Sequence, residues 1–132
     1  MRRLGIDFGR KRVGLALTDE LGRSAYPLSV LANDDKLLRQ IASICRGEKV
    51  VEVVLGESLN YRRAGNPIMR AILRFKRKLE SAIKLPVVLE DETLTTREAI
   101  RDPEGEFLPT SDPLLDARAA AILLRQYLSR LK

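Results

Sequence analysis

Histidine is absent from this 132-residue chain, and cysteine occurs only once. Without histidine the chain cannot build Ser-His-Asp or Cys-His catalytic sets, or a metal site with imidazole ligands. The single cysteine, Cys45, excludes an internal disulfide and a structural zinc site of several cysteines. It falls at an apolar position of a predicted helix, where we expect a buried, unreactive thiol. Any chemistry must therefore use carboxylates, lysines or hydroxyl groups.

Long apolar runs and aromatic residues are also scarce. No run approaches the ~20 residues that cross a bilayer, so we expect no membrane span. We expect most of the three tyrosines and three phenylalanines to be core residues, so a stacking platform for single strands is poorly supported. The chain has no repeat or linker, which indicates one domain over residues 1–132. Met1 is followed at once by arginines and strand residues, so we expect no secretory signal and a cytoplasmic protein.

The chain has an excess of positively charged residues. The chain has 24 lysines and arginines against 18 acids, a formal net charge of +6. A basic protein favours polyanionic partners such as nucleic acid. The hydrophobic fraction of 45% and charged fraction of 32% are typical of a soluble globular protein.

Residues 2–18 predict two strands joined by a tight turn. Two apolar runs flank the turn sequence that begins at Gly9 and ends at Arg12. Asp7 lies within the first run, where an ionised carboxylate needs a partner, hydrogen bonds or a metal. Two interpretations stay open: Asp7 ends the strand and caps the turn, or it serves a function.

The remaining elements follow from periodicity and turn residues. We expect an edge strand at 24–31 containing Pro27. A helix then follows, with its N-cap and first-turn acids supplied by residues 33–35, and it ends at Gly47. After it we expect a strand at 50–55, a helix at 68–83 and a strand at 86–89. The remainder is predicted to form a short helix capped by Thr95 and Glu98, a loop at 102–111, and a final helix with Asp112 as N-cap and Pro113 as first helical residue. Strands that alternate with helices imply parallel pairing through right-handed crossovers.

Acidic residues gather where the predicted parallel strands end. Asp7, Glu57, Asp91 and Glu92 lie at such ends, and Asp116 falls in the first turn of the last helix. Functional sites of open α/β sheets form at this edge. Carboxylates brought together repel one another unless a hard cation such as Mg²⁺ or Mn²⁺ binds them. Two such ions about 4 Å apart can activate water against a phosphodiester without histidine.

Each acid also has a plainer explanation. Glu57 and Glu90 are readily explained as solvated charges, and Asp91 as a turn cap. Asp116 could complement the helix N-terminus. Because Asp112 is predicted to fill the capping role, we favour a function for Asp116.

Four motifs in order resemble the YqgF (RuvX) family of ribonuclease H-like nucleases, relatives of the Holliday junction resolvases. GIDFGRKRVGLALTD is similar to the family's GxDxGxKRxGxAxxD, and VVLGESLN takes the place of a strand that ends in GLPxN. LEDETLTTREA resembles DERxTTxEA, and LLDARAAAILLRQYL resembles VDxxAAxxILxxYL. The resemblance covers nearly the whole chain.

The resemblance implies an α/β ribonuclease H-like fold. Its five-stranded mixed sheet has strands 1–3 antiparallel, strands 4 and 5 parallel to a central strand 1, and helices on both faces. It implies a catalytic and metal-binding site at Asp7, Glu92 and Asp116, with Mg²⁺ or Mn²⁺, and we expect two ions. It further implies a nuclease that processes the 5′ end of precursor 16S rRNA, with RNA, branched DNA or precursor ribosomal particles as partners.

This sequence departs from the family pattern at two places. Thr93 replaces the arginine that usually follows the glutamate, which removes an expected phosphate contact or carboxylate partner. Glu57 and Ser58 replace the leucine and proline of GLP. Glu57 thereby becomes a further candidate ligand.

Basic residues near these motifs are candidates for contacts with nucleic acid. Tyr61 joins them because it lies in a basic loop; the set is Arg10, Lys11, Arg12, Tyr61, Arg62, Arg63 and Arg97. Three other functions stay open: a junction resolvase, an adaptor without catalysis, and an ATPase of the actin and sugar-kinase type. Length argues against the ATPase, since such proteins close two domains around a nucleotide.

Overall fold

The computed structural model describes residues 1–58, 67–92 and 113–131; for residues 57, 58, 67, 68, 91 and 92 it describes the backbone alone. Its elements are β1 (Arg2–Phe8), β2 (Arg12–Thr18), β3 (Ala25–Ala32), α1 (Leu37–Gly47), β4 (Val50–Ser58), α3 (Pro67–Ile83), β5 (Val87–Glu92) and α4 (Leu115–Arg130). The predicted short helix near Thr95 and the loop at 102–111 lie outside the described residues.

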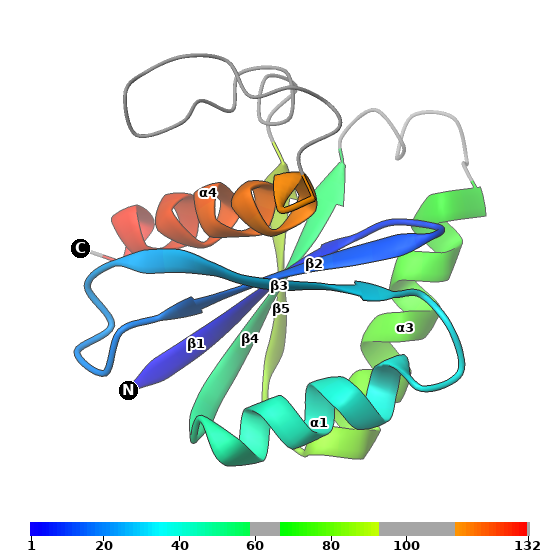
Figure 1. Ribbon diagram of the computed structural model, residues 1–132, viewed down its shortest axis with the longest axis horizontal. Coiled ribbons are helices and arrows are strands. Elements are labelled where there is room, and N and C mark those ends of the chain that lie inside the picture. Colours follow the sequence, from blue (N-terminus) through cyan, green and yellow to red (C-terminus); the bar gives the residue numbers. More distant parts are fainter. Residues whose placement is uncertain (59–66, 93–112, 132) are drawn as a thin grey trace.

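The five strands form one mixed sheet in the order β3-β2-β1-β4-β5, with β1 at its centre (Figure 1). β1, β2 and β3 pair antiparallel, whereas β4 pairs parallel with β1 and β5 pairs parallel with β4. The predicted mixed sheet is confirmed. β3 is an edge strand, as Pro27 indicated, because proline cannot donate to a further neighbour.

Helices cover both faces of this sheet. α1 and α3 lie on one face and α4 on the other (Figure 1). Leu4 and Ile6 belong to the larger core cluster, which includes residues of α1 and α3. Gly5, between them on β1, packs against α4 instead: a Cβ there would lie 3.0 Å from the carbonyl oxygen of Ala120. α4 therefore approaches the sheet closely at this glycine.

Two helix starts differ from the prediction. α1 has Lys36 at its N-cap and no acid in its first turn, because Asp34 caps the preceding turn: its Oδ1 accepts a hydrogen bond from the Lys36 N–H at 2.9 Å. α4 has Leu114 at its N-cap, and Pro113 lies in a turn before the helix. Neither N-cap residue makes a side-chain capping bond.

Gly47 ends α1, as predicted. The left-handed residue of the turn into β4 is Lys49, with φ 55°, rather than the glycine. None of the helices among the described residues combines the length and apolarity that crossing a bilayer requires.

Candidate active site at the carboxyl edge of the sheet

Asp7 is a buried acid at the end of the central strand. It is 1% exposed and pairs with Gly14 in the β1–β2 ladder. Side chains alternate along a strand, so Asp7 lies on the same face as Gly5, toward α4. Its neighbour Ile6 belongs to the larger core cluster, on the face that α1 and α3 cover. A carboxylate in such a place needs a partner, hydrogen bonds or a metal ion.

Asp116 reaches the same place from the far end of the sequence. It lies in the first turn of α4 and is 6% exposed. Its backbone packs on Gly14: a Cβ added there would stand 2.0 Å from the Asp116 carbonyl oxygen. Since Gly14 also pairs with Asp7, one glycine lies beside both acids. The structure thus brings Asp7 and Asp116 to positions on the same glycine.

Arg12, at the start of β2, forms an ion pair with Asp116. Its Nε lies 3.1 Å from Asp116 Oδ2, and the arginine side chain is 68% exposed. Arg12 was predicted to contact nucleic acid, and its described partner is a site carboxylate. The other predicted cations of the turn, Arg10 and Lys11, are exposed at the same edge.

Asn33 fixes the turn that carries these cations. Its Nδ2 donates to the Gly9 carbonyl oxygen at 2.7 Å, and its backbone N–H donates to the Lys11 carbonyl oxygen at 2.9 Å. The sequence suggested Asn33 as a helix cap. Its contact with the turn joins segments 24 residues apart, so local pattern gave no signal for it.

Glu92 is the last residue of β5, and its backbone pairs with Ser58 of β4. Glu57 and Asp91 pair one residue earlier. The side chains of these residues lie outside the described part of the structure, and so do Tyr61, Arg62, Arg63, Thr93, Arg97 and Asp112. Within the described part, no three acidic, cysteine or histidine side chains form a metal-binding group.

Polar contacts hold α4, and with it Asp116, on the sheet. Glu52 of β4 accepts a hydrogen bond from Tyr127 Oη at 3.1 Å and from Arg3 Nε at 2.7 Å. Burial and the Glu52 carboxylate both raise the pKa of Tyr127, which keeps the phenol protonated as a donor.

Glu90 of β5 also holds α4 on the sheet, and its burial contradicts the prediction that it is solvated. It was expected to be solvated, but it is 1% exposed on β5. It accepts a hydrogen bond from Gln126 Nε2 at 2.8 Å and pairs with Arg130 of α4. The signal was present in the strand alternation, because Glu90 follows Val88 by two residues and Val88 packs against the α4 cluster.

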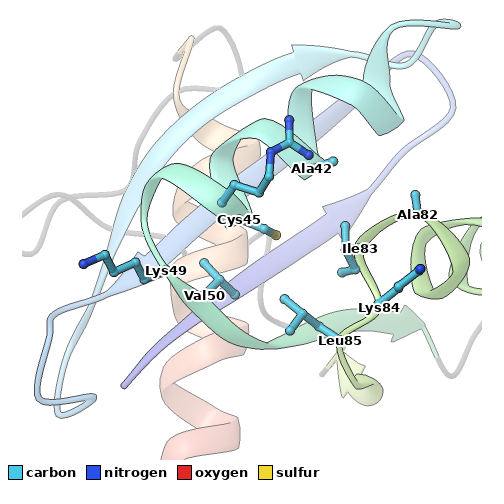
Figure 2. Close-up of a pocket in the computed structure, with 9 residues that line it drawn as sticks. Ala42, Cys45, Lys49, Val50, Ala82, Ile83, Lys84 and Leu85 are labelled. Atoms are coloured by element: carbon cyan, nitrogen blue, oxygen red, sulfur yellow. The ribbon is translucent and has the colours of Figure 1, made fainter.

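A cavity of about 290 Å³ lies at the opposite edge of the sheet, where β4 and β5 begin. Figure 2 shows residues from α1, α3, the start of β4 and the segment that precedes β5 around it. Apolar and basic residues line it: Ala42, Cys45, Arg46, Lys49, Val50, Ala82, Ile83, Lys84 and Leu85. Cys45 is buried, as predicted, and burial raises the pKa of its thiol to about 11. This cavity is separate from the acidic site.

A mixed sheet with β1 at its centre, helices on both faces and acids at its carboxyl edge defines a ribonuclease H-like protein. Two solved structures share the fold. RuvC of T. thermophilus in complex with a Holliday junction substrate has a TM-score of 0.63 at 18% identity, covering 99% of this chain and 96% of that one. The fowlpox virus Holliday junction resolvase has a TM-score of 0.63 at 14% identity, with full coverage of both chains.

The family model of RuvX, described as Holliday junction resolvase, matches residues 1–130. The chain therefore belongs to the RuvX family. A relative from Syntrophus aciditrophicus (strain SB), named "Putative pre-16S rRNA nuclease", is 37% identical and covers 97% of this chain and 88% of its own. One of the same name from Anaeromyxobacter dehalogenans (strain 2CP-C) is 35% identical, with 98% of each chain covered. These names place the chain in a family of nucleases, hydrolases of phosphodiester bonds.

Proposed function

We propose that this chain is a metal-dependent nuclease that processes the 5′ end of precursor 16S rRNA in the cytoplasm. The observation that carries the proposal is the pair of buried carboxylates, Asp7 and Asp116, on either side of Gly14. The names of the relatives support the substrate. RNA within precursor ribosomal particles is the proposed partner.

The donor set at this edge fits a hard divalent cation. Asp7 and Asp116 offer carboxylate oxygens, the ligands that Mg²⁺ and Mn²⁺ prefer. We assign Glu92 as a third ligand or as the base that orients the attacking water, because β5 ends with it at the same edge of the sheet. Two bound ions would acidify a water and offset the charge of the phosphodiester.

Basic residues of the chain hold the nucleic acid at this site. Arg10 and Lys11, exposed in the turn beside Asp7, bind phosphates that flank the scissile bond. Asn33 holds that turn in place through its two hydrogen bonds. We extend the same role to Tyr61, Arg62, Arg63 and Arg97, which the sequence places in basic segments. Arg12 pairs with Asp116 at the same edge, and its exposed side chain is a further candidate for a phosphate contact.

A second candidate is cleavage of branched DNA, favoured by the description of the matching family model as a Holliday junction resolvase. The two functions share the acids and differ in the nucleic acid that the basic residues hold.

One experiment tests the proposal. The wild-type protein, Asp7→Asn and Asp116→Asn are incubated with Mg²⁺ or Mn²⁺ and with precursor 16S leader RNA, single-stranded RNA or a four-way DNA junction. We expect leader RNA to be cut by the wild type, and each variant to lose about a hundredfold or more in rate, because each removes a metal ligand. The exposed Asp35→Asn is the matched control and should cleave normally.

Excess EDTA should abolish the wild-type reaction. Cleavage that survives in both site variants would show that these acids are not the site. Cleavage of the junction alone would favour the second candidate, and binding without any cleavage would indicate an adaptor.

A further inference from the structure

Positive charge is concentrated in one layer of the molecule. Residues 36–49 and 67–84, which contain α1 and α3, carry ten lysines and arginines and two glutamates, whereas the whole chain has a net charge of only +6. The net positive charge of this layer is therefore larger than that of the whole chain. Such an asymmetry produces a positive field over the face of the sheet opposite α4.

On α3 four exposed cations form a row that we call the α3 ridge: Arg70, Arg74, Arg77 and Lys78. Their spacing of three and four residues places them on one side of the helix. The buried residues Ile72, Phe75 and Leu79 occupy the other side. The ridge thus faces outward along about two turns of helix.

Helix stability does not explain the ridge. Arg70 and Arg74 are four residues apart, as are Arg74 and Lys78, and like charges at this spacing destabilise a helix. Arg70 also lies in the first turn, where a cation opposes the helix dipole and where α3 has no acid. The single acid of α3, Glu80, pairs with Lys76, which is not part of the ridge.

The ridge starts at the edge where the candidate active site lies. α3 is the next described element after β4, and it begins at the carboxyl end of that strand (Figure 1). The ring of Phe75, between ridge residues, lies 4.8 Å from the ring of Phe8 at the end of β1. Phe8 immediately precedes the turn with Arg10 and Lys11. Nucleic acid held at that turn can continue along α3.

We propose that the α3 ridge binds the phosphate backbone of a double-stranded segment that flanks the strand to be cut. The proposal rests on the proposed nuclease function and adds a second contact for the same substrate. An RNA stem and a DNA junction arm share this chemistry. The ridge residues fix position and carry no base readout, because their cationic groups recognise phosphates.

The surface composition favours a duplex over a single strand. Phe75 is the one aromatic residue of α1 and α3, and it is buried, so neither helix offers a platform for base stacking. The ridge spans about 12 Å at 1.5 Å per residue. One strand of a duplex presents a phosphate about every 3.4 Å of axis, so the ridge can face three or four of them.

Binding measurements test the ridge. In an Asp7→Asn background, which limits cleavage, Arg74→Gln/Arg77→Gln is compared with the unaltered ridge. The control, Arg23→Gln/Arg39→Gln, removes the same charge from exposed positions off the ridge. Fluorescence anisotropy is recorded with a 16-base-pair RNA stem bearing a 5′ tail, a DNA duplex with the same tail, and the tail alone. Circular dichroism confirms that each variant is folded.

We expect the ridge variant to bind a tailed duplex about tenfold more weakly, with less than a twofold change for the tail alone. The slope of log affinity against log salt should fall by about two, one for each lost phosphate contact. Loss for the RNA stem alone identifies that stem as the ligand, and loss for the DNA duplex alone identifies a junction arm. Unchanged duplex binding, or an equal loss in the control, overturns the proposal. If the ridge binds an acidic protein instead, the ridge variant would show unchanged duplex binding.

The two proposals fail in different ways. If wild-type protein cuts no substrate but duplex binding depends on the ridge, the nuclease function fails and the ridge stands. If cleavage occurs and duplex binding ignores the ridge, only the ridge fails.

Discussion

The backbone of Asp116 rests on Gly14, where a Cβ would stand 2.0 Å from the Asp116 carbonyl oxygen. Gly14 is also the ladder partner of Asp7. The two acids are therefore neighbours because β2 has no side chain at this position. A contact with backbone cannot be relieved by a rotamer change, so the first turn of α4 must move if a methyl group is added.

We predict that Gly14→Ala displaces the start of α4. The extra methyl group should cost about 1–3 kcal/mol of unfolding free energy, as overpacking does in tight interiors. A shift near 1 Å at Asp116 should lower the cleavage rate about a hundredfold. Urea unfolding and initial rates measure the two effects.

Gly47→Ala is the matched control, since a Cβ there meets no atom within 4 Å. It lies in α1, so the change should leave stability equal or raise it by about 0.5–1 kcal/mol, with full activity. A normal rate in folded Gly14→Ala protein would show that the contact does not position Asp116.

Much of the fold was predictable because it depends on periodicity. Apolar alternation located β1 and β2, and the helical spacing of Ile72, Phe75 and Leu79 located α3 and its buried face. The order of elements gave the parallel pairing of β4 and β5. Asp7 stood out because it interrupts an apolar strand.

Features that depend on tertiary contacts were not predictable from local pattern. Asp112 and Pro113 form a strong capping pattern, yet α4 begins at Leu115, after the turn that contains Pro113. We attribute this start to the packing of Asp116 on Gly14. Strand alternation places Glu90 on the buried face, but local pattern gave no signal for its partner Arg130, which is 40 residues away. In each case the deciding neighbour is distant in sequence.

The Glu90–Arg130 pair should contribute more to stability than an exposed ion pair. Arg130→Gln leaves the buried Glu90 carboxylate without its guanidinium, and we expect a loss of about 2–4 kcal/mol in urea unfolding. Lys76→Gln breaks the pair with Glu80, whose carboxylate is 38% exposed rather than buried, and should cost about 0.5 kcal/mol or less. Equal losses of unfolding free energy in the two variants would show that burial of the Glu90 carboxylate does not strengthen its ion pair.

Cys45 should make stability fall at high pH. Burial raises the pKa of its thiol from 9.0 to about 11, so between these values the folded protein keeps a proton that the unfolded chain releases. Stability is therefore complete below pH 9 and declines as pH rises toward 11. Unfolding of wild type and Cys45→Ala across this range measures the slope, which should be shallower in the variant. At pH 8 a thiol reagent should label native Cys45 far more slowly than unfolded protein.

Arg12 should compete with a metal ion for Asp116. Its guanidinium, 3.1 Å from Oδ2, places a positive charge where the proposed cation binds. Removing that charge in Arg12→Gln should raise the affinity for Mn²⁺ several-fold in calorimetric titrations without nucleic acid, because two cations near one carboxylate repel each other. Arg10→Gln removes a neighbouring exposed charge and should change the affinity by less than twofold. Weaker Mn²⁺ binding in Arg12→Gln would indicate that the arginine is needed to orient Asp116 as a ligand.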